Sequence, residues 1–465
     1  MRLFLSSIII LSLLSLIGCG GSKRKNQETH AESNDSLPDT LNELLGQSGK
    51  YFSVNIPTEC TAKNQTDFIY QVMYDSYLFT DSVDNTIDPK EYSDPKKLLA
   101  DLRYEKDKYS FLMDSETLLK FFQEGRSENF GLDFFYAPVE GQTFYYLIIS
   151  YVYPNSPADQ AGLKRGDIIT HLNTLAIYDL NEAFTMFSQE ETLNLTITNY
   201  NEVGTRNITI TKAEYSISTV LDARILTQNG KKIGYIVFQD FISQAKEELD
   251  YYFKLLKGRG IDELVLDLRY NSGGDTSVAN HLATLIGGEK VYDKVFDKIY
   301  FNDKYSKYNY KEYFTNRNDN ALDLKRVFII TSQFTASSSE LVINSLKASD
   351  NGVEVIQVGS TTYGKPYAFL PTIFCDQALL VVNLESKNSD GIGGYIDGIE
   401  PTCNADDDLF SAFGDPMEAS LNEALYYISN NKCKPANTTL TKINKPTLKA
   451  QAIPRIGSRQ IISAY

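Results

Sequence analysis

Residues 327–346 read VFIITSQFTASSSELVINSL, an apolar run followed by a polar turn and a second apolar segment. The run 327–330 is typical of a buried strand, and the segment 341–346 is typical of a helix. Ser337 lies at the turn between them, where a hydroxyl group would be close to the positive end of a helix dipole and to unpaired backbone N–H groups. An acyl-transfer nucleophile needs this geometry. An ordinary capping box formed by Ser337 and Glu340 has the same sequence pattern, so other motifs must distinguish the two.

Strand-like and helix-like runs alternate on both sides of this stretch, from about residue 216 to residue 430. Strands are expected at 236–238, 264–268 and 353–358, and helices at 247–257 and 278–286. This alternation predicts an α/β domain built around a mostly parallel sheet. The segment 431–465 is polar and rich in lysine and threonine, and we expect it to be a peripheral tail.

Two loops of the α/β domain carry residues suited to acyl-transfer chemistry. The strand at 264–268 leads into Gly273 and Gly274, whose backbone can approach a ligand and point N–H groups at it. The strand at 353–358 leads into a loop with Lys365 between a glycine and a proline. A neutral lysine can act as the general base when burial lowers its pKa. The chain has no convincing histidine for that role, since its three histidines are scattered over His30, His171 and His281.

Upstream of the α/β domain the sequence changes character twice. Apolar residues recur at helical spacing over residues 41–126, which predicts an N-terminal helical domain. Residues 127–215 contain short alternating strands, and their run SPADQAGLKRGDII at 156–169 closely resembles the core of the PDZ module. The resemblance implies a groove that binds a peptide as an added strand and captures its terminal carboxylate. The loop implied for this capture consists of Phe130, Gly131, Leu132, Asp133 and Phe134.

Three motifs follow the PDZ-like module in a fixed order: LDLRYNSGG at 266–274, TASSSE at 335–340 and GSTTYGK at 359–365. Together they resemble the S41 family of serine peptidases, the C-terminal or tail-specific processing proteases, over about residues 44–429. The helical segment also looks like the N-terminal domain of Bacteroidetes-type members. The resemblance implies a ClpP/crotonase-like α/β catalytic fold, Ser337 as nucleophile and Lys365 as base. It implies backbone N–H groups at Gly273 and at or next to Ser337 or Ser338 as oxyanion donors, and no cofactor.

The sequence departs from the family pattern at two points. The spacing between Ser337 and Lys365 is a few residues longer, which an insertion near residues 347–351 could absorb. Many members carry a glutamine four residues after the lysine, where it orients the amine, and here that position is Phe369. Either another group orients Lys365 or the arrangement is a Ser/Lys dyad, and the candidates for that group are Thr361, Thr362 and Tyr363.

The N-terminus has the pattern of an export signal. One positive residue precedes the apolar run 3–17, which is shorter than a spanning helix needs and ends at Cys19 in a sequence that resembles a bacterial lipobox. We therefore expect a signal peptide at 1–18, a lipid on Cys19, and a tether at 19–40. The expected location is the cell envelope, with the protein anchored as a lipoprotein at the outer membrane or the periplasmic face.

The amino-acid composition limits the classes of partner that the chain can bind. The net charge of −15 argues against nucleic acid, because phosphate binding favours a basic surface. No metal site is expected, because there is no Cys-x-x-Cys pair and the acidic run at 404–408 lacks an EF-hand spacing. In an exported chain the other four cysteines can form disulfides, and three pairings of Cys60, Cys375, Cys403 and Cys433 are open. The sequence leaves oligomerisation open as well.

The leading hypothesis is thus a lipid-anchored serine endopeptidase that selects protein substrates through their C-terminal region. The first alternative is a peptide-binding chaperone or adaptor that kept the fold without catalysis, for which Phe369 is the best support. A hydrolase acting on esters or glycans is a second alternative. The absence of a Gly-x-Ser-x-Gly elbow and the PDZ-like module argue against it.

Overall fold

The structure is a computed structural model that describes residues 54–199, 204–315 and 317–435. Its largest sheet has the strand order β10-β11-β12-β15-β16-β21. The strands are β10 (Val220–Gln228), β11 (Lys231–Phe238), β12 (Glu263–Asp267), β15 (Arg326–Thr331), β16 (Glu354–Gly359) and β21 (Cys403–Asn404). All neighbours are parallel except β10 and β11. The predicted parallel sheet is therefore present, with an antiparallel hairpin at one edge.

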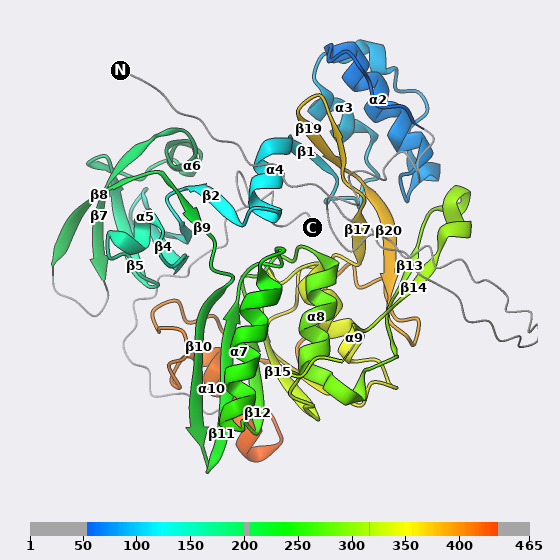
Figure 1. Cartoon of the computed structure of the whole chain (residues 1–465). Helices are drawn as coiled ribbons and strands as arrows, with labels where there is room; N and C mark the ends of the chain where they lie inside the picture. Colours follow the sequence, from blue (N-terminus) through cyan, green and yellow to red (C-terminus); the bar gives the residue numbers. More distant parts are fainter. Residues whose placement is uncertain (1–53, 200–203, 316, 436–465) are drawn as a thin grey trace, which may run out of the picture. The chain divides into compact units, whose positions relative to one another are not determined.

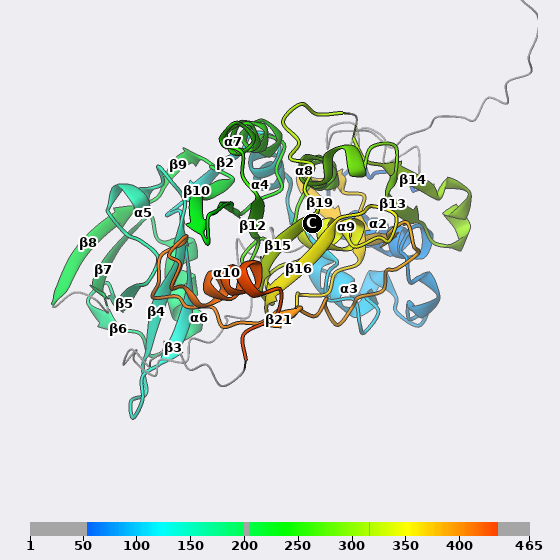
Figure 2. The same cartoon turned by 90° about the horizontal axis from the view of Figure 1, so that it is seen from below.

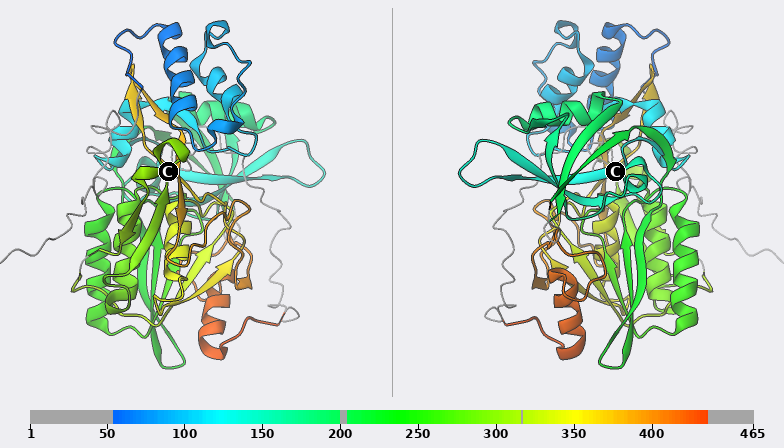
Figure 3. Two further views of the ribbon diagram at one scale, coloured as in Figure 1. Left: turned by 90° about the vertical axis from the view of Figure 1, so that its right-hand side faces the viewer. Right: turned by 90° about the vertical axis from the view of Figure 1, so that its left-hand side faces the viewer.

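Helices cover both faces of this sheet. One apolar core joins it to α7 (Ala245–Arg259), α8 (Thr276–Gly287) and α9 (Ser338–Leu346), and another joins it to α10 (Ala419–Asn430). Figure 3 shows α7 and α8 on one side of the sheet and α10 on the other. Strands β12, β15 and β16 are almost wholly buried, which explains their continuous apolar sequences.

A second sheet of the catalytic region has the order β14-β13-β20-β17. Its strands are β13 (Val295–Tyr300), β14 (Tyr310–Tyr313), β17 (Tyr367–Phe369) and β20 (Val382–Lys387), with the short helices η3 (Gly288–Lys290) and η4 (Asp303–Tyr308) nearby in sequence. Strand β17 begins two residues after Lys365, so this sheet holds the C-terminal end of the loop that carries the lysine.

The N-terminal region is helical, as predicted, with α2 (Ala62–Asp75), α3 (Pro95–Leu102), α4 (Ser115–Phe122) and the 3-10 turns η1 (Thr80–Ser82) and η2 (Pro89–Glu91). It also contributes a strand that the sequence did not predict, β1 (Phe111–Asp114). This strand pairs with β19 (Gln377–Leu380), which pairs with β18 (Thr372–Phe374). A disulfide between Cys60 and Cys375 ties the start of the region to the same hairpin. Strand β1 of the helical region and the β18-β19 hairpin of the catalytic region thus form one sheet and pack in one apolar core (Figure 1).

The PDZ-like region contains a sheet with the order β3-β4-β5-β7-β8. Its elements are β3 (Leu132–Pro138), β4 (Tyr145–Val152), α5 (Pro157–Gln160), β5 (Asp167–Leu172), β6 (Leu175–Ala176), α6 (Leu180–Gln189), β7 (Thr192–Asn199) and β8 (Thr205–Thr211). Two further strands, β2 (Arg126–Asn129) and β9 (Ala213–Ser216), pair with each other where the chain enters and leaves. Among the described residues β3 pairs only with β4, so its other edge has no strand beside it (Figure 2).

No helix in the described ranges is long and apolar enough to cross a membrane. The predicted signal peptide, Cys19, the tether and most of the C-terminal tail lie outside the described residues.

Candidate active site

The three sequence motifs meet at one edge of the large sheet. They follow β12, β15 and β16, and because these neighbours are parallel their carboxyl ends lie side by side. Direct hydrogen bonds join the loops. Ala336 N–H donates to the carbonyl of Asn271 at 3.1 Å, and Tyr363 N–H donates to the carbonyl of Thr335 at 2.9 Å. The fold therefore brings the glycine loop, the serine turn and the lysine loop together.

Ser337 is the residue immediately before α9, as predicted, and only 8% of it is exposed. Its φ of 54° and ψ of −117° lie in a region that residues with a side chain rarely adopt. Such a conformation costs free energy and persists only where the surroundings hold it. Strained backbone of this kind concentrates at functional sites, which favours a role for Ser337 beyond capping.

The two neighbouring serines have structural partners. Ser338 Oγ donates to the carbonyl of Gly274 at 2.6 Å, and Ser339 Oγ donates to the carbonyl of Asn271 at 3.1 Å. Both hydroxyl groups therefore anchor α9 to the glycine loop. The capping box suggested by the sequence is also present, because Ser337 and Glu340 each accept a hydrogen bond from the backbone of the other. Of the three adjacent serines only Ser337 has the strained backbone, which favours it as the nucleophile.

Glu340 links the serine turn to the lysine loop. Its Oε2 accepts hydrogen bonds from the backbone N–H groups of Ser337 at 2.9 Å and Lys365 at 2.8 Å. Its Oε1 accepts from Thr362 Oγ1 at 2.5 Å and from Gly364 N–H at 2.7 Å. Burial raises the pKa of Glu340, although these donors act in the opposite direction. One fully buried carboxyl group thus fixes both proposed catalytic residues through their backbones.

Lys365 is 1% exposed, and its side chain lies against the aromatic ring of Phe369. The Nζ atom is 3.9 Å from the ring centroid, which is a cation–π distance. The position where the family pattern has a glutamine therefore contacts the lysine amine in this chain too, through a ring face instead of an amide oxygen.

The glycine loop differs in detail from the prediction for the oxyanion donors. Gly273 N–H donates to Asn271 Oδ1 at 2.8 Å, so in this conformation it is engaged within the loop. The hydrogen bonds of the described residues include none from the N–H of Gly274 or from that of Ser338, the first residue of α9. Gly274 has a φ of 144°, and a Cβ atom there would lie 2.2 Å from the carbonyl oxygen of Phe241. Among the described residues, the N–H groups of Gly274 and Ser338 therefore remain available as candidates for oxyanion donors, and the role of Gly273 stays a prediction.

The PDZ-like region contacts the glycine loop through an ionic group in which the Arg165 side chain is buried and that of Asp407 is 27% exposed. Arg165 donates to the hydroxyl of Tyr270 at 2.6 Å and to Asp407 Oδ1 at 2.8 Å, and Tyr270 donates to Asp407 Oδ2 at 2.5 Å. Burial opposes ionisation of Asp407, but Arg165 and Arg269 outweigh it and hold its pKa below the usual value. Because Tyr270 directly precedes Asn271, these contacts hold the start of the glycine loop in place.

The predicted peptide-binding loop forms part of an aromatic wall opposite α6. The rings of Phe130 and Phe134 lie 5.9 and 4.7 Å from that of Phe187 on α6. Gly131 has a φ of 75°, and a Cβ atom there would lie 2.0 Å from Ser156 Cβ. A cavity of about 490 Å³ adjoins this wall, and its lining includes Leu132, Asp133 and Phe187. All five predicted residues therefore lie at one end of the unpaired edge of β3.

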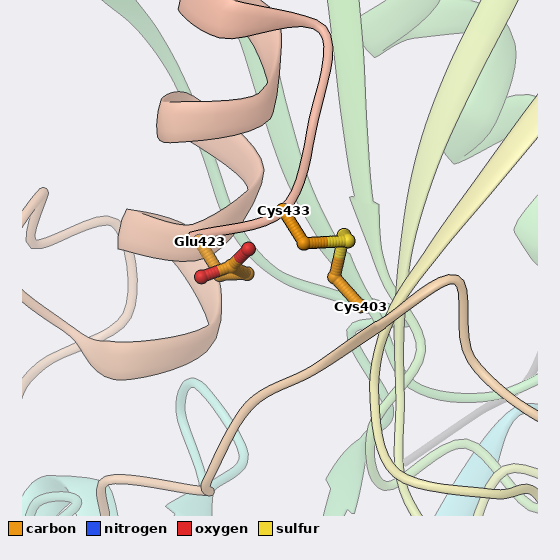
Figure 4. A group of neighbouring side chains, drawn as sticks. All are labelled: Cys403, Glu423 and Cys433. Atoms are coloured by element: carbon orange, nitrogen blue, oxygen red, sulfur yellow. A yellow bond between two sulfur atoms is a disulfide. The ribbon is translucent and has the colours of Figure 1, made fainter. Parts of the chain in front are cut away.

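One group of residues has the composition of a metal site, namely Cys403, Glu423 and Cys433. Figure 4 shows that the two cysteines are joined, and the structure pairs them as a disulfide. Their sulfur atoms are then not thiolates, which are the form of cysteine that binds metals. The disulfide pairing that the sequence left open is thus Cys60 with Cys375 and Cys403 with Cys433.

Comparisons with known proteins agree with this architecture. The model of peptidase family S41 matches residues 232–405, that of the peptidase S41 N-terminal domain matches 64–111, and that of the PDZ domain matches 148–198. Residues 232–405 thus form a catalytic domain of peptidase family S41. The chain combines this domain with the S41 N-terminal domain and a PDZ domain, which confirms the predicted fold class.

Among curated relatives, the carboxy-terminal processing protease CtpB of Bacillus subtilis is 28% identical over 268 residues, which cover 56% of this chain and 51% of that protein. The carboxyl-terminal-processing protease of a Picosynechococcus strain is 27% identical over 216 residues, or 46% of this chain and 49% of that protein. The chain thus spans about half the length of these relatives. Among solved structures, a putative S41 protease from Bacteroides fragilis is 26% identical with a TM-score of 0.67, covering 78% of this chain and 97% of that one.

The sequence named Thr362 as one candidate for orienting Lys365, and in the structure its hydroxyl group binds Glu340, which in turn binds the Lys365 backbone. Other residues of the site were not predicted from the sequence. Tyr109 gave no such signal, because it is 255 positions from Gly364, whose carbonyl it contacts. Pairing of β1 with β19 is what brings the N-terminal segment to the lysine loop.

Proposed function

We propose that this chain is a serine endopeptidase with a Ser/Lys catalytic pair. The observation that carries the proposal is the single carboxyl group of Glu340, which binds the backbone N–H groups of both Ser337 and Lys365. Ser337 is in a strained conformation at the start of α9, and Lys365 is buried in the loop whose backbone shares Glu340 Oε2 with it. A simple helix cap would need neither the strain nor the lysine.

In the proposed reaction Ser337 Oγ attacks the carbonyl carbon of the scissile peptide bond while Lys365 Nζ accepts the hydroxyl proton. The N–H groups of Gly274 and Ser338 stabilise the negative oxygen of the tetrahedral intermediate. Lys365 then gives its proton to the leaving amine, and an acyl-enzyme on Ser337 remains. Water hydrolyses that ester with Lys365 again as base. The chemistry needs no cofactor.

The PDZ-like region would select protein substrates by their C-terminal region. Strand β3 offers an unpaired edge to which an extended peptide can add, and Leu132 and Phe187, which line the adjoining cavity, can contact its side chains. The contacts of Arg165 with Tyr270 link the same region to the glycine loop. Arg165 would therefore connect the peptide-binding region directly to the catalytic glycine loop.

The proposed location is the cell envelope, with a lipid on Cys19. Support comes from the sequence pattern at residues 3–19. Metabolic labelling with a fatty-acid probe in a bacterial host tests it. Label on the full chain that disappears in Cys19→Ala is expected, and label retained by Cys19→Ala would contradict lipidation there.

A serine-reactive fluorophosphonate probe tests the catalytic proposal. We expect labelling of the purified chain that is lost in Ser337→Ala and reduced at least about 100-fold in Lys365→Ala, since removing one member of a catalytic unit removes most of its rate. Ser360→Ala is the matched control, because Ser360 is exposed in the neighbouring loop. Proteolysis that persists in Ser337→Ala would refute the assignment.

The alternative is a peptide-binding protein without catalysis, and one observation favours it. Gly273 N–H, expected to bind the oxyanion, donates to Asn271 instead. In that case neither the wild type nor Ser337→Ala would react with the probe, while both would bind C-terminal peptides with equal affinity. Measuring peptide binding beside probe labelling separates the two functions.

A further inference from the structure

We propose that Tyr109, from the N-terminal helical region, is a positioning residue for Lys365. The proposal rests on the proposed function, because it assigns the means by which the lysine of that site is held. In most family members a glutamine near the lysine would serve, and in this chain that position is Phe369. The loop that carries Lys365 is contacted instead by Tyr109, which precedes Gly364 by 255 positions in the sequence.

The peptide group that leads into Lys365 is bonded at both ends. Its N–H, that of Lys365, donates to Glu340 Oε2 at 2.8 Å. Its carbonyl, that of Gly364, accepts a hydrogen bond from the hydroxyl group of Tyr109. A peptide plane held at both ends cannot rotate, so the direction in which the Lys365 side chain leaves the backbone is fixed. Without Tyr109, Glu340 alone would hold this plane.

The residues around Tyr109 touch the same loop. Lys108 Nζ donates to the carbonyl of Tyr363 at 3.3 Å and lies 4.2 Å from the centroid of the Tyr363 ring. The ring of Phe111 lies 6.2 Å from that of Phe369, whose face contacts Lys365 Nζ. The segment 108–111 thus contacts the loop before the lysine and the ring beneath the amine.

Tyr109 is itself rigidly held. Its ring packs against those of Tyr363 and Tyr367 with centroid distances of 6.0 and 5.7 Å. The buried carboxylate of Asp107 accepts from the N–H groups of Tyr109 and Ser110 at 2.8 and 3.0 Å, which closes the turn. Burial raises the pKa of Tyr109, so its hydroxyl group keeps its proton and can donate to Gly364 at any physiological pH.

The gap left by removing one hydroxyl group is small, which makes Tyr109→Phe a clean test. The ring and its packing stay, and only the bond to Gly364 is lost. We expect kcat for a peptide substrate to fall by about 10- to 100-fold, since small displacements of a catalytic group have effects of this size. KM should change less than about twofold, because Tyr109 lies in neither the PDZ-like wall nor β3. The rate of fluorophosphonate labelling of Ser337 should fall with kcat.

Tyr92→Phe is the matched control. Tyr92 is in the same region, and its hydroxyl group donates to Asp101 at 2.8 Å at an exposed position. We expect wild-type kcat for this variant. In a Lys365→Ala background, Tyr109→Phe should cause no further loss, because it acts only through the lysine. If Tyr109→Phe does not fold, Lys108→Met replaces it, since Lys108 is exposed and should still lower kcat, by about 2- to 10-fold.

Several outcomes would overturn the proposal. A Tyr109→Phe variant with wild-type kcat and normal labelling would show that the hydroxyl group does not position Lys365. An equal additional loss in the Lys365→Ala background would assign the effect to folding instead. Failure of the proposed function looks different, because the wild type itself would then lack labelling that depends on Ser337.

Discussion

At the scale of single residues, the site depends on buried carboxyl groups as much as on Ser337 and Lys365. Glu340 is buried with four donors around it, which act against the rise in its pKa that burial causes. Asp240 is also buried but has fewer partners. Its Oδ2 accepts from Tyr153 in the PDZ-like region at 2.7 Å, while among the described residues its Oδ1 has no hydrogen-bond partner. This difference makes Asp240 sensitive to pH.

Burial raises the pKa of Asp240 from 3.8 to about 7, with Glu248 adding to the shift and the Tyr153 hydroxyl opposing it. Between these values the folded chain binds a proton that the unfolded chain does not. The free energy of unfolding should therefore fall as pH rises from about 4 to about 7, and stay level above that. The cost at high pH is at most about 4 kcal/mol.

Asp240→Asn should remove this dependence. We expect the difference in unfolding free energy, variant minus wild type, to rise from pH 4 to pH 7 and then level off. Urea unfolding at several pH values measures it, with the exposed Asp303→Asn as control. A difference that does not vary with pH would show that Asp240 titrates in its ordinary range.

At the scale of elements, the β1-β19-β18 sheet joins the N-terminal helical region to a hairpin of the catalytic region. The disulfide between Cys60 and Cys375 spans 315 residues, whereas that between Cys403 and Cys433 spans 30. In the chain-entropy model a longer closed loop gives more stabilisation, here by about 2 kcal/mol. The longer bridge also holds the helical region that carries Tyr109.

Removing each bridge should therefore have different effects. The pair Cys60→Ser and Cys375→Ser should lower both the unfolding free energy and kcat, because the N-terminal segment then detaches more readily from the lysine loop. The pair Cys403→Ser and Cys433→Ser should lower stability with less effect on kcat. Thermal unfolding and peptide cleavage by folded protein measure the two quantities. Equal effects on kcat would argue against the special role of the first bridge.

Much of the element structure could be predicted from the sequence. The apolar run 327–330 and the segment 341–346 lie in β15 and α9, and the three motifs lie at the expected strand ends. Strand β1 was missed because it is four residues long and is stabilised by its partner β19 rather than by its own pattern. The bond from Tyr109 to Gly364 depends on that pairing, so no local signal could reveal it.

At the scale of the whole molecule, the PDZ-like and catalytic regions are joined by charge. Arg165 contacts Asp407 and Tyr270, and Arg269 contacts Asp407 at 3.0 Å and Glu418 at 2.8 Å. The motif LDLRYNSGG supplies both Arg269 and Tyr270, so the same nine residues carry the proposed oxyanion loop and the junction. The sequence predicted only the role in the proposed site, because contacts of Arg269 and Tyr270 with residues 407 and 418 have no local pattern.

Arg165→Met tests the junction. Asp407 would lose one of its two cations and keep Arg269 and Tyr270 as partners. Because 27% of the Asp407 side chain is exposed, the loss should be smaller than the roughly 3–5 kcal/mol of a fully buried pair. In the double variant Arg165→Met with Asp407→Asn the loss should be smaller than the sum of the single losses. A double-mutant cycle by urea unfolding measures this coupling. Additive losses would mean that the two residues do not interact in solution.

The hydrogen bond between Tyr109 and Gly364 also affects the order in which the site can assemble during translation. Translation proceeds from the N-terminus, so residue 109 exists long before residue 364, and Ser337, the proposed nucleophile, is made between them. We expect a growing chain to contain Ser337 without a held Lys365 until the lysine loop has been made and has docked on Tyr109. Under the proposed function, the unfinished chain would therefore lack a complete catalytic pair.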